Sequence, residues 1–255
     1  MKSSIMVLVA VLLLGAMFPM ITCGEGKIAV AVLKGDGVGP NSSASIKRLL
    51  GADPRFTVRD ITGAEIGSGG LQGIAVLVLP GGLGHSESEL MGPAGRQAVK
   101  DFLRNGGGYL GFCAGAYLAT QDSPGNLALT AVKVKSPLWR RGEATLNLAL
   151  TPAGKAILPH SEAENIPIHY ENGPVVENAP TAGLPPIEVL AVFKTETAEN
   201  GTPAGVQIGS PAIWSAKYGN GRVVVSSAHP ELTDTLHSWV APLALLAAGK
   251  TEAKP

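Results

Sequence analysis

The sequence predicts an α/β protein built on a mainly parallel sheet, with helices on both faces and extra β-strands in its second half. Short apolar runs bounded by turn residues are typical of strands buried on both faces, and they alternate with helix-like segments over residues 27–120. Such alternation favours parallel strands joined by crossover helices. Beyond this region, alternating apolar and polar residues indicate antiparallel strands with one solvated face. We expect one domain over residues 24–250 and a polar tail at 251–255.

The predicted elements follow from local sequence. Buried strands are expected at residues 27–33, 74–79, 108–112 and 222–227, with a more alternating strand at 56–61. Asn41 or Ser42 is expected to cap a helix that ends at Leu50. Apolar residues at helical spacing predict helices at 95–104 and 114–120. In the second half, strands are expected at 127–134, 144–150, 187–193, 205–208 and 212–218, before a closing apolar helix at 236–248.

Composition excludes several classes of protein. The chain has 255 residues, 20 Lys and Arg against 20 Asp and Glu, and 45% hydrophobic residues. A disordered chain needs lower hydrophobicity and higher net charge, and a nucleic-acid binder held by a broad basic field needs an excess of Lys and Arg. Two cysteines are too few for a disulfide scaffold. We therefore expect a folded domain that binds no nucleic acid.

The first 23 residues are predicted to be a targeting segment outside the fold. Lys2 precedes an apolar run over residues 5–18, which is typical of a secretory signal. An uncleaved anchor that attaches the chain to a membrane is the alternative, because the run approaches the length that spans a bilayer. Residues 20–23 resemble a bacterial lipoprotein signal, which would imply a lipid on Cys23. We predict an exported protein (periplasmic, secreted or lipid-anchored), and we flag Cys113 as a reactive thiol.

A cysteine follows directly after the strand predicted at residues 108–112. The segment GFCAG places Cys113 between a strand and a helix, with a glycine two residues away on each side. A nucleophile at such a turn adopts strained backbone angles, and small neighbours let the turn close against adjacent strands. The start of a helix favours an anionic sulfur and offers N–H groups, such as that of Ala114, to an oxyanion. The alternative is an inert core cysteine, since free cysteines are often buried.

A histidine and a glutamate follow the strand predicted at residues 222–227. His229 and Glu231 are expected on the rim where open α/β sheets bind ligands. The Cys113 strand ends at the same rim, so the imidazole would take the thiol proton while Glu231 orients the ring. The alternative is a solvated loop histidine followed by a capping glutamate.

Other segments carry further signals. The glycines of the segment at residues 79–83, Gly81 and Gly82, follow a buried strand, and the N–H of Gly82 would complete an oxyanion hole with that of Ala114. An ordinary glycine turn is the alternative. Residues 170–173 would line a pocket or form a plain turn. The glycines at 35–39 are spaced too closely for a dinucleotide loop, and the histidines show no tight metal spacing. We expect no cofactor and no metal.

Three of these segments, taken in their order along the chain, resemble the class I glutamine amidotransferase-like superfamily. The matching features are Pro-Gly-Gly at residues 80–82, Gly-x-Cys-x-Gly at 111–115 and His-x-Glu at 229–231. Within the superfamily, residues 107–119 and 32–38 are most similar to the domain found at the N-terminus of biotin–protein ligases.

The resemblance implies a flavodoxin-like fold and a set of roles. Cys113 would be the nucleophile, His229 the base and Glu231 the orienting residue, while Gly82 and Ala114 would form the oxyanion hole through their backbone. We expect no synthetase or ligase domain after this one, and so no glutamine hydrolysis coupled to biosynthesis. The resulting hypothesis is an exported cysteine hydrolase that acts on an amide or ester of a small molecule or peptide. The alternative is a non-catalytic module that binds a small ligand or a protein.

Overall fold

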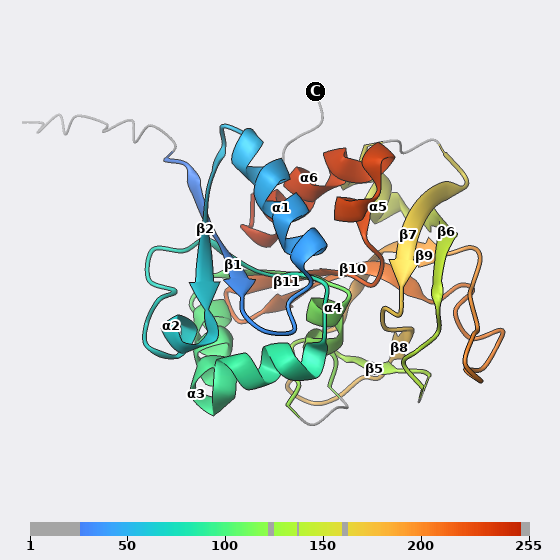
Figure 1. The fold of residues 1–255 in the computed structure, drawn as a ribbon, viewed down its shortest axis with the longest axis horizontal. Helices are drawn as coiled ribbons and strands as arrows, with labels where there is room; N and C mark the ends of the chain where they lie inside the picture. Colours follow the sequence, from blue (N-terminus) through green and yellow to red (C-terminus); the bar gives the residue numbers. More distant parts are fainter. Residues whose placement is uncertain (1–25, 122–124, 137, 160–162, 251–255) are drawn as a thin grey trace, which may run out of the picture.

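The computed structural model describes residues 26–121, 125–136, 138–159 and 163–250 (Figure 1). Within these ranges, nine strands form one sheet in the order β2-β1-β3-β4-β11-β10-β9-β6-β7. Its parallel half contains β2 (Phe56–Thr62), β1 (Ile28–Lys34), β3 (Val76–Leu79), β4 (Gly108–Phe112) and β11 (Gly221–Ser226). Its antiparallel half contains β10 (Pro211–Tyr218), β9 (Glu188–Phe193), β6 (Glu143–Leu150) and β7 (Ile166–Glu171). This arrangement confirms the predicted fold class.

Helices cover both faces of the sheet and enclose two apolar cores. The helices α1 (Pro40–Ala52), α5 (Pro152–Ile157) and α6 (Val240–Ala247) lie on one face. The other face carries α2 (Gly63–Gly67), α3 (Gly84–Arg104), α4 (Ala114–Ala119) and the small sheet of β5 (Val132–Val134) and β8 (Val176–Asn178). In β1, Val30 and Val32 enter the first core while Ala31 and Leu33 enter the second. Because β1 is buried on both faces, its sequence is a continuous apolar run.

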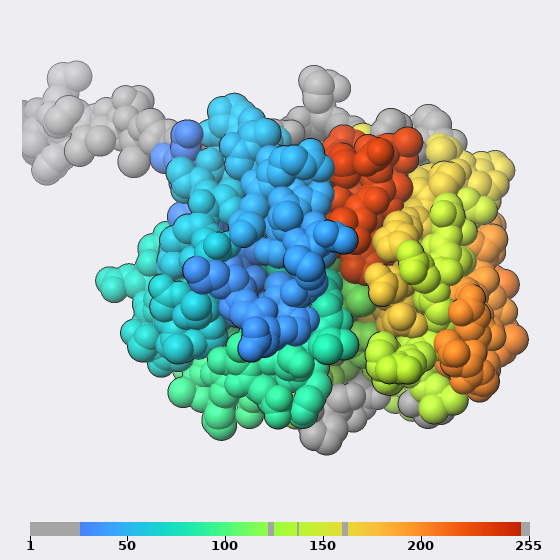
Figure 2. Space-filling view, in the orientation of Figure 1, coloured from blue at the N-terminus to red at the C-terminus, as the bar shows by residue number. Residues whose placement is uncertain are grey.

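The residues after β11 join the two halves of the molecule. They form the short 3₁₀ helices η1 (Pro230–Leu232) and η2 (Asp234–Trp239) before α6. Helix α1 packs against both η1 and α6, and β7 packs against η1. The space-filling view shows these C-terminal residues in red, seated between the blue α1 and the yellow residues of the second half (Figure 2). Segments far apart in the sequence therefore meet around η1.

Several predicted elements differ from the observed ones. Helix α3 begins at Gly84 instead of residue 95 and bends at Gly92, which precedes Pro93. No strand forms at residues 205–208, where turns include the positive-φ residue Gly205. The prediction that Asn41 or Ser42 caps the first helix is wrong, because Gly39 is the cap and Pro40 occupies the first turn. Ser42 lies inside the helix and is buried.

The predicted signal at residues 1–23 and the polar tail at 251–255 lie outside the described residues. In the part of the chain that the structure describes, no helix combines the length and apolar character needed to cross a membrane.

Candidate active site

Cys113 occupies a sharp turn between β4 and α4. Its backbone angles are φ 45° and ψ −93°, in a region that non-glycine residues rarely adopt. A Cβ on Gly111 would lie 2.7 Å from the carbonyl oxygen of Gly115, and one on Gly115 would lie 2.5 Å from that of Leu79. Only glycine at these two positions lets the turn pack this closely. The structure thus has the strained strand-to-helix turn that the sequence predicts.

His229 and Glu231 form a buried pair just beyond β11. The imidazole Nδ1 lies 2.8 Å from Oε1 of Glu231, and the side chains are only 4% and 0% exposed. The N–H of His229 donates to the carbonyl of His169 on β7, which fixes the backbone of His229. Nε2 is buried and has no hydrogen-bond partner among the described residues. The ring is therefore oriented through Nδ1, while Nε2 is left to exchange a proton.

The surroundings of His229 favour its charged form. Burial would lower the pKa of the imidazole, but the Glu231 carboxylate and the side chain of Cys113 outweigh this effect and hold the pKa well above its ordinary value. Cys113 and His229 line the same cavity. A histidine held in this way is suited to stabilising a neighbouring thiolate.

Gly82 lies in a backbone bridge between the β3–α3 turn and the β1–α1 turn. The bridge is closed by Gly39 N–H donating to the Gly81 carbonyl (2.7 Å) and by Leu83 N–H donating to the Gly37 carbonyl (2.8 Å). Neither bond uses the N–H of Gly82. Its φ of 151° and the close approach of the Gly37 carbonyl exclude a side chain at this position.

One cavity of about 990 Å³ brings the candidate residues together. Its wall includes Cys113, His229 and Gly82, which come from the carboxyl ends of β4, β11 and β3. Ala114 is the first residue of α4, so its N–H has no partner within that helix. Glu231 lies behind His229. The structure thus brings the nucleophile, base and orienting residue of the hypothesis to one edge of the sheet.

A loop after β7 closes over the thiol. Sγ of Cys113 donates to the carbonyl of Glu171 at 3.3 Å, and the Tyr117 hydroxyl donates to the carbonyl of Asn172 at 3.1 Å. Asn172 has a φ of 52°, and its Oδ1 accepts a hydrogen bond from the N–H of Gly142. Glu171 and Asn172 line the cavity, as one of the two readings of residues 170–173 expects. Nothing in the sequence indicates that this loop contacts Cys113.

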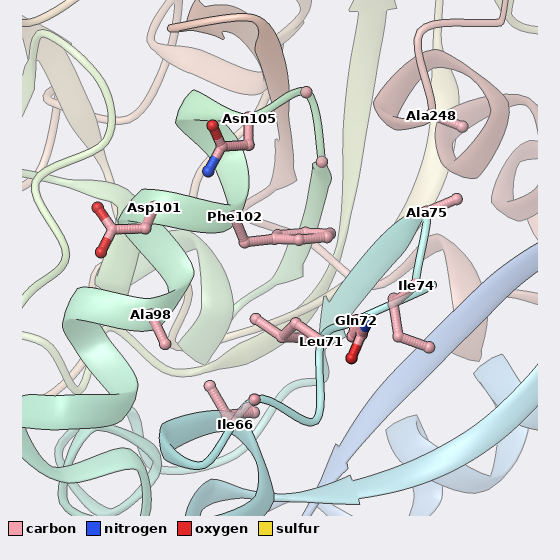
Figure 3. A pocket seen from close by; sticks show the side chains of 13 residues that line it. Ile66, Leu71, Gln72, Ile74, Ala75, Ala98, Asp101, Phe102, Asn105 and Ala248 are labelled. Atoms are coloured by element: carbon pink, nitrogen blue, oxygen red, sulfur yellow. The ribbon is translucent and has the colours of Figure 1, made fainter.

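A second hollow, of about 550 Å³, lies at the amino ends of β3 and β4 (Figure 3). Its wall includes the apolar residues Ile66, Leu71 and Phe102, and the polar side chains labelled there are Gln72, Asp101 and Asn105. None of the predicted site residues lines it. Among the residues that the structure describes, no group of three His, Cys, Asp or Glu side chains is placed to hold a metal ion.

Comparisons with known proteins agree with this architecture. Residues 28–135 match the family model of the biotin-protein ligase N-terminal domain. That segment contains Cys113 and Gly82 and ends before His229. The comparison with curated proteins gave no match.

Solved structures resemble almost the whole chain. A ThuA-like protein from Parabacteroides merdae aligns with a TM-score of 0.59 at 12% identity, over 90% of this chain and 93% of that one. A ThuA-like protein from Bacteroides uniformis gives 0.56 at 14% identity, over 91% and 94%. A β-galactosidase from Bacillus circulans gives 0.54 at 15% identity, over 89% of this chain but only 32% of that one. At these identities the likeness establishes the fold: this chain has the α/β fold of the ThuA-like proteins.

Proposed function

We propose that this protein is an exported cysteine hydrolase that acts on an amide or ester of a small molecule or peptide. The observation that carries the proposal is the strained Cys113 sharing a cavity with His229, whose ring is held by Glu231. A strained nucleophile, an oriented base and unused backbone N–H groups are the components of acyl transfer.

The proposed reaction has two halves. Sγ of Cys113 attacks the substrate carbonyl while its proton passes to Nε2 of His229, and the N–H groups of Gly82 and Ala114 hold the oxyanion. The C–N or C–O bond then breaks as Nε2 returns that proton to the leaving amine or alcohol, which leaves an acyl thioester. Water next attacks the thioester carbonyl and gives a proton to Nε2. Cleavage of the C–S bond releases the acid, and the proton returns to the sulfur.

Export rests on the sequence of residues 1–23, with an unprocessed anchor or a lipid on Cys23 as the alternative outcomes. The mass of the N-terminal peptide from cells distinguishes these outcomes. A mature chain that begins after residue 23, or a lipid-modified Cys23, supports export. An unmodified chain that keeps Met1 in the cytoplasmic fraction contradicts it.

A binding module on the same fold is the second candidate. The observation in its favour is that Cys113 is only 7% exposed and its thiol donates to the Glu171 carbonyl. A cavity of about 990 Å³ is also of the size that holds a small ligand. This candidate predicts ligand-dependent thermal stabilisation that Cys113→Ala leaves intact.

A panel of amides and esters tests the two candidates directly. Hydrolysis by the wild type that Cys113→Ala abolishes, with an unchanged circular dichroism spectrum and melting temperature, is the expected result. The matched control is Ser136→Ala, which alters another buried cavity residue without touching the proposed chemistry. Full turnover by Cys113→Ala would overturn the mechanism.

A further inference from the structure

A serine of helix α1 reaches into the candidate site from a distant part of the sequence. Ser42 is only 3% exposed. Its hydroxyl donates to Oε1 of Glu231 at 2.7 Å and accepts a hydrogen bond from the N–H of Gly81 at 2.9 Å. One buried hydroxyl therefore contacts both the acid of the proposed triad and the turn that carries Gly82.

The chemistry of the hydroxyl fixes the direction of both bonds. A serine hydroxyl has one proton to donate and lone pairs to accept. Gly81 N–H can only donate, so the proton of Ser42 is free for the Glu231 carboxylate. Charge-assisted bonds of this kind are shorter and stronger than bonds between neutral groups. Within the described residues, Oε2 of Glu231 has no partner, so Oε1 carries both stabilising contacts, from Ser42 and from His229.

Two further contacts hold helix α1, Glu231 and the turn at residues 80–82 together. Ser45, one helical turn after Ser42, donates its hydroxyl proton to the backbone carbonyl of Glu231. A Cβ on Gly81 would lie 2.5 Å from Cε1 of His229, so the turn packs directly against the imidazole. Helix α1 thus holds the backbone and the carboxylate of Glu231 at once, and Ser42 links that carboxylate to the turn that touches the ring.

We propose that Ser42 is a positioning residue that couples Glu231 to the glycine turn at residues 80–82. The inference rests on the proposed function for the roles of His229 and Gly82. Ser42 does not meet the reacting atoms. It keeps the Glu231 carboxylate aimed at Nδ1, and it holds the Gly82 N–H in place for the oxyanion.

The test compares Ser42→Ala with wild type and with Ser43→Ala. Ser43 is the neighbouring buried serine of α1 and serves as the matched control. The first readout is the titration of the His229 imidazole, followed by nuclear magnetic resonance. The ring of His169 lies 5.5 Å from that of His229 and is followed in the same spectra. The second readout is the rate at which iodoacetamide alkylates Cys113, measured on the Cys113 peptide by mass spectrometry.

The expected result is specific to Ser42. In Ser42→Ala, the Glu231 carboxylate loses one of the two contacts that hold Oε1 beside Nδ1, so it attracts the imidazolium less strongly and His229 should titrate about one pH unit lower than in wild type. Cys113 alkylation at pH 7 should fall several-fold, while Ser43→Ala matches wild type in both readouts. The same His229 titration in Ser42→Ala and wild type would overturn the inference.

The two readouts separate this inference from the proposed function. The His229 titration reports the His229–Glu231 pair and needs no reactive thiol. A wild-type Cys113 that reacts like an ordinary thiol, together with a His229 titration that moves in Ser42→Ala, would contradict the hydrolase and support the positioning role. A reactive wild-type thiol with a titration that Ser42→Ala leaves in place would support the hydrolase and contradict the positioning role.

Discussion

Two hollows lie at opposite ends of the parallel strands and differ in the side chains that line them. One lies at the carboxyl ends and is lined by Cys113 and His229, and the other lies at the amino ends, where none of the described residues in its wall is a cysteine or a histidine. Each is lined by one member of a pair between a carboxylate and a basic side chain, His229 in the first and Asp101 in the second. His229 and Glu231 are 2.8 Å apart and buried, whereas Asp101 and Arg104 are 2.7 Å apart and about half exposed.

This contrast shows that the surroundings of a pair decide what it can do. In water, the Asp101–Arg104 attraction is screened and contributes little to stability. In the interior, the attraction between His229 and Glu231 is strong enough to hold the pKa of His229 above its ordinary value, although burial alone would lower it. The carboxyl-end cavity therefore differs from the amino-end hollow in having beside it a charged pair that water cannot screen.

Breaking the buried pair should have the largest effect. Glu231→Gln leaves His229 without its carboxylate and should lower the free energy of unfolding by about 3–5 kcal/mol at pH 6. Asp101→Asn, its counterpart in the amino-end hollow, should leave the unfolding midpoint in urea nearly unchanged. An equal loss of stability in Glu231→Gln and Asp101→Asn would contradict the role that we give to burial.

The pH dependence of the Glu231→Gln effect follows from the sign of the His229 shift. The pKa of His229 in the folded state lies above its ordinary 6.5, so the stabilisation is complete below pH 6.5 and is lost as pH rises through the folded pKa. Urea unfolding from pH 5.5 to pH 9 should therefore show the gap between wild type and Glu231→Gln shrinking toward alkaline pH. A gap that widens would contradict the assignment.

A pair of glycine substitutions should have the next largest effect. Gly82→Ala places a Cβ against the Gly37 carbonyl at a φ of 151°, and should cost about 2–3 kcal/mol. Gly69 lines the amino-end hollow at a φ of 92° with open space around it, so Gly69→Ala should cost only about 1 kcal/mol. Thermal unfolding measures both, and a larger loss in Gly69→Ala would argue against the tight bridge at Gly82.

Glu87 is a second buried carboxyl, and its surroundings contrast with those of Glu231. Glu87 is fully buried, and neither of its oxygens has a hydrogen-bond partner among the described residues. Burial raises its pKa well above the ordinary 4.5. Its ionisation therefore opposes folding as pH rises above 4.5. Glu87→Gln should stabilise the protein by about 1–2 kcal/mol at pH 7 and have almost no effect at pH 4, which is the reverse of Glu231→Gln. Destabilisation at pH 7 would indicate a partner for this carboxyl.

The smallest effect is expected in the amino-end hollow. Asn105 is exposed there, so Asn105→Ala should change stability by less than about 0.5 kcal/mol. The rate of Cys113 alkylation should stay at the wild-type value. A marked change in that rate would mean that the two ends of the strands are coupled.

Local sequence was enough to predict the parallel strands and the turn at Cys113. A continuous apolar run indicates a strand buried on both faces, and glycines two residues either side of a cysteine indicate a tight turn. Local sequence did not predict the contacts between segments that lie far apart along the chain. Ser42 looks like a helix cap, but its hydroxyl is taken by Glu231, 189 residues away. The first turns of α3 were missed because polar residues lead into Gly92 and Pro93, which indicate a break.

The central claim is that Cys113 and His229 act together, and the pH dependence of Cys113 alkylation tests it most directly. The rate is measured on the Cys113 peptide in wild type and in His229→Ala. An ordinary thiol slows by roughly a hundredfold or more between pH 9 and pH 6. We predict a much shallower fall in wild type and the ordinary fall in His229→Ala. The ordinary fall in both proteins would contradict it and favour the binding module.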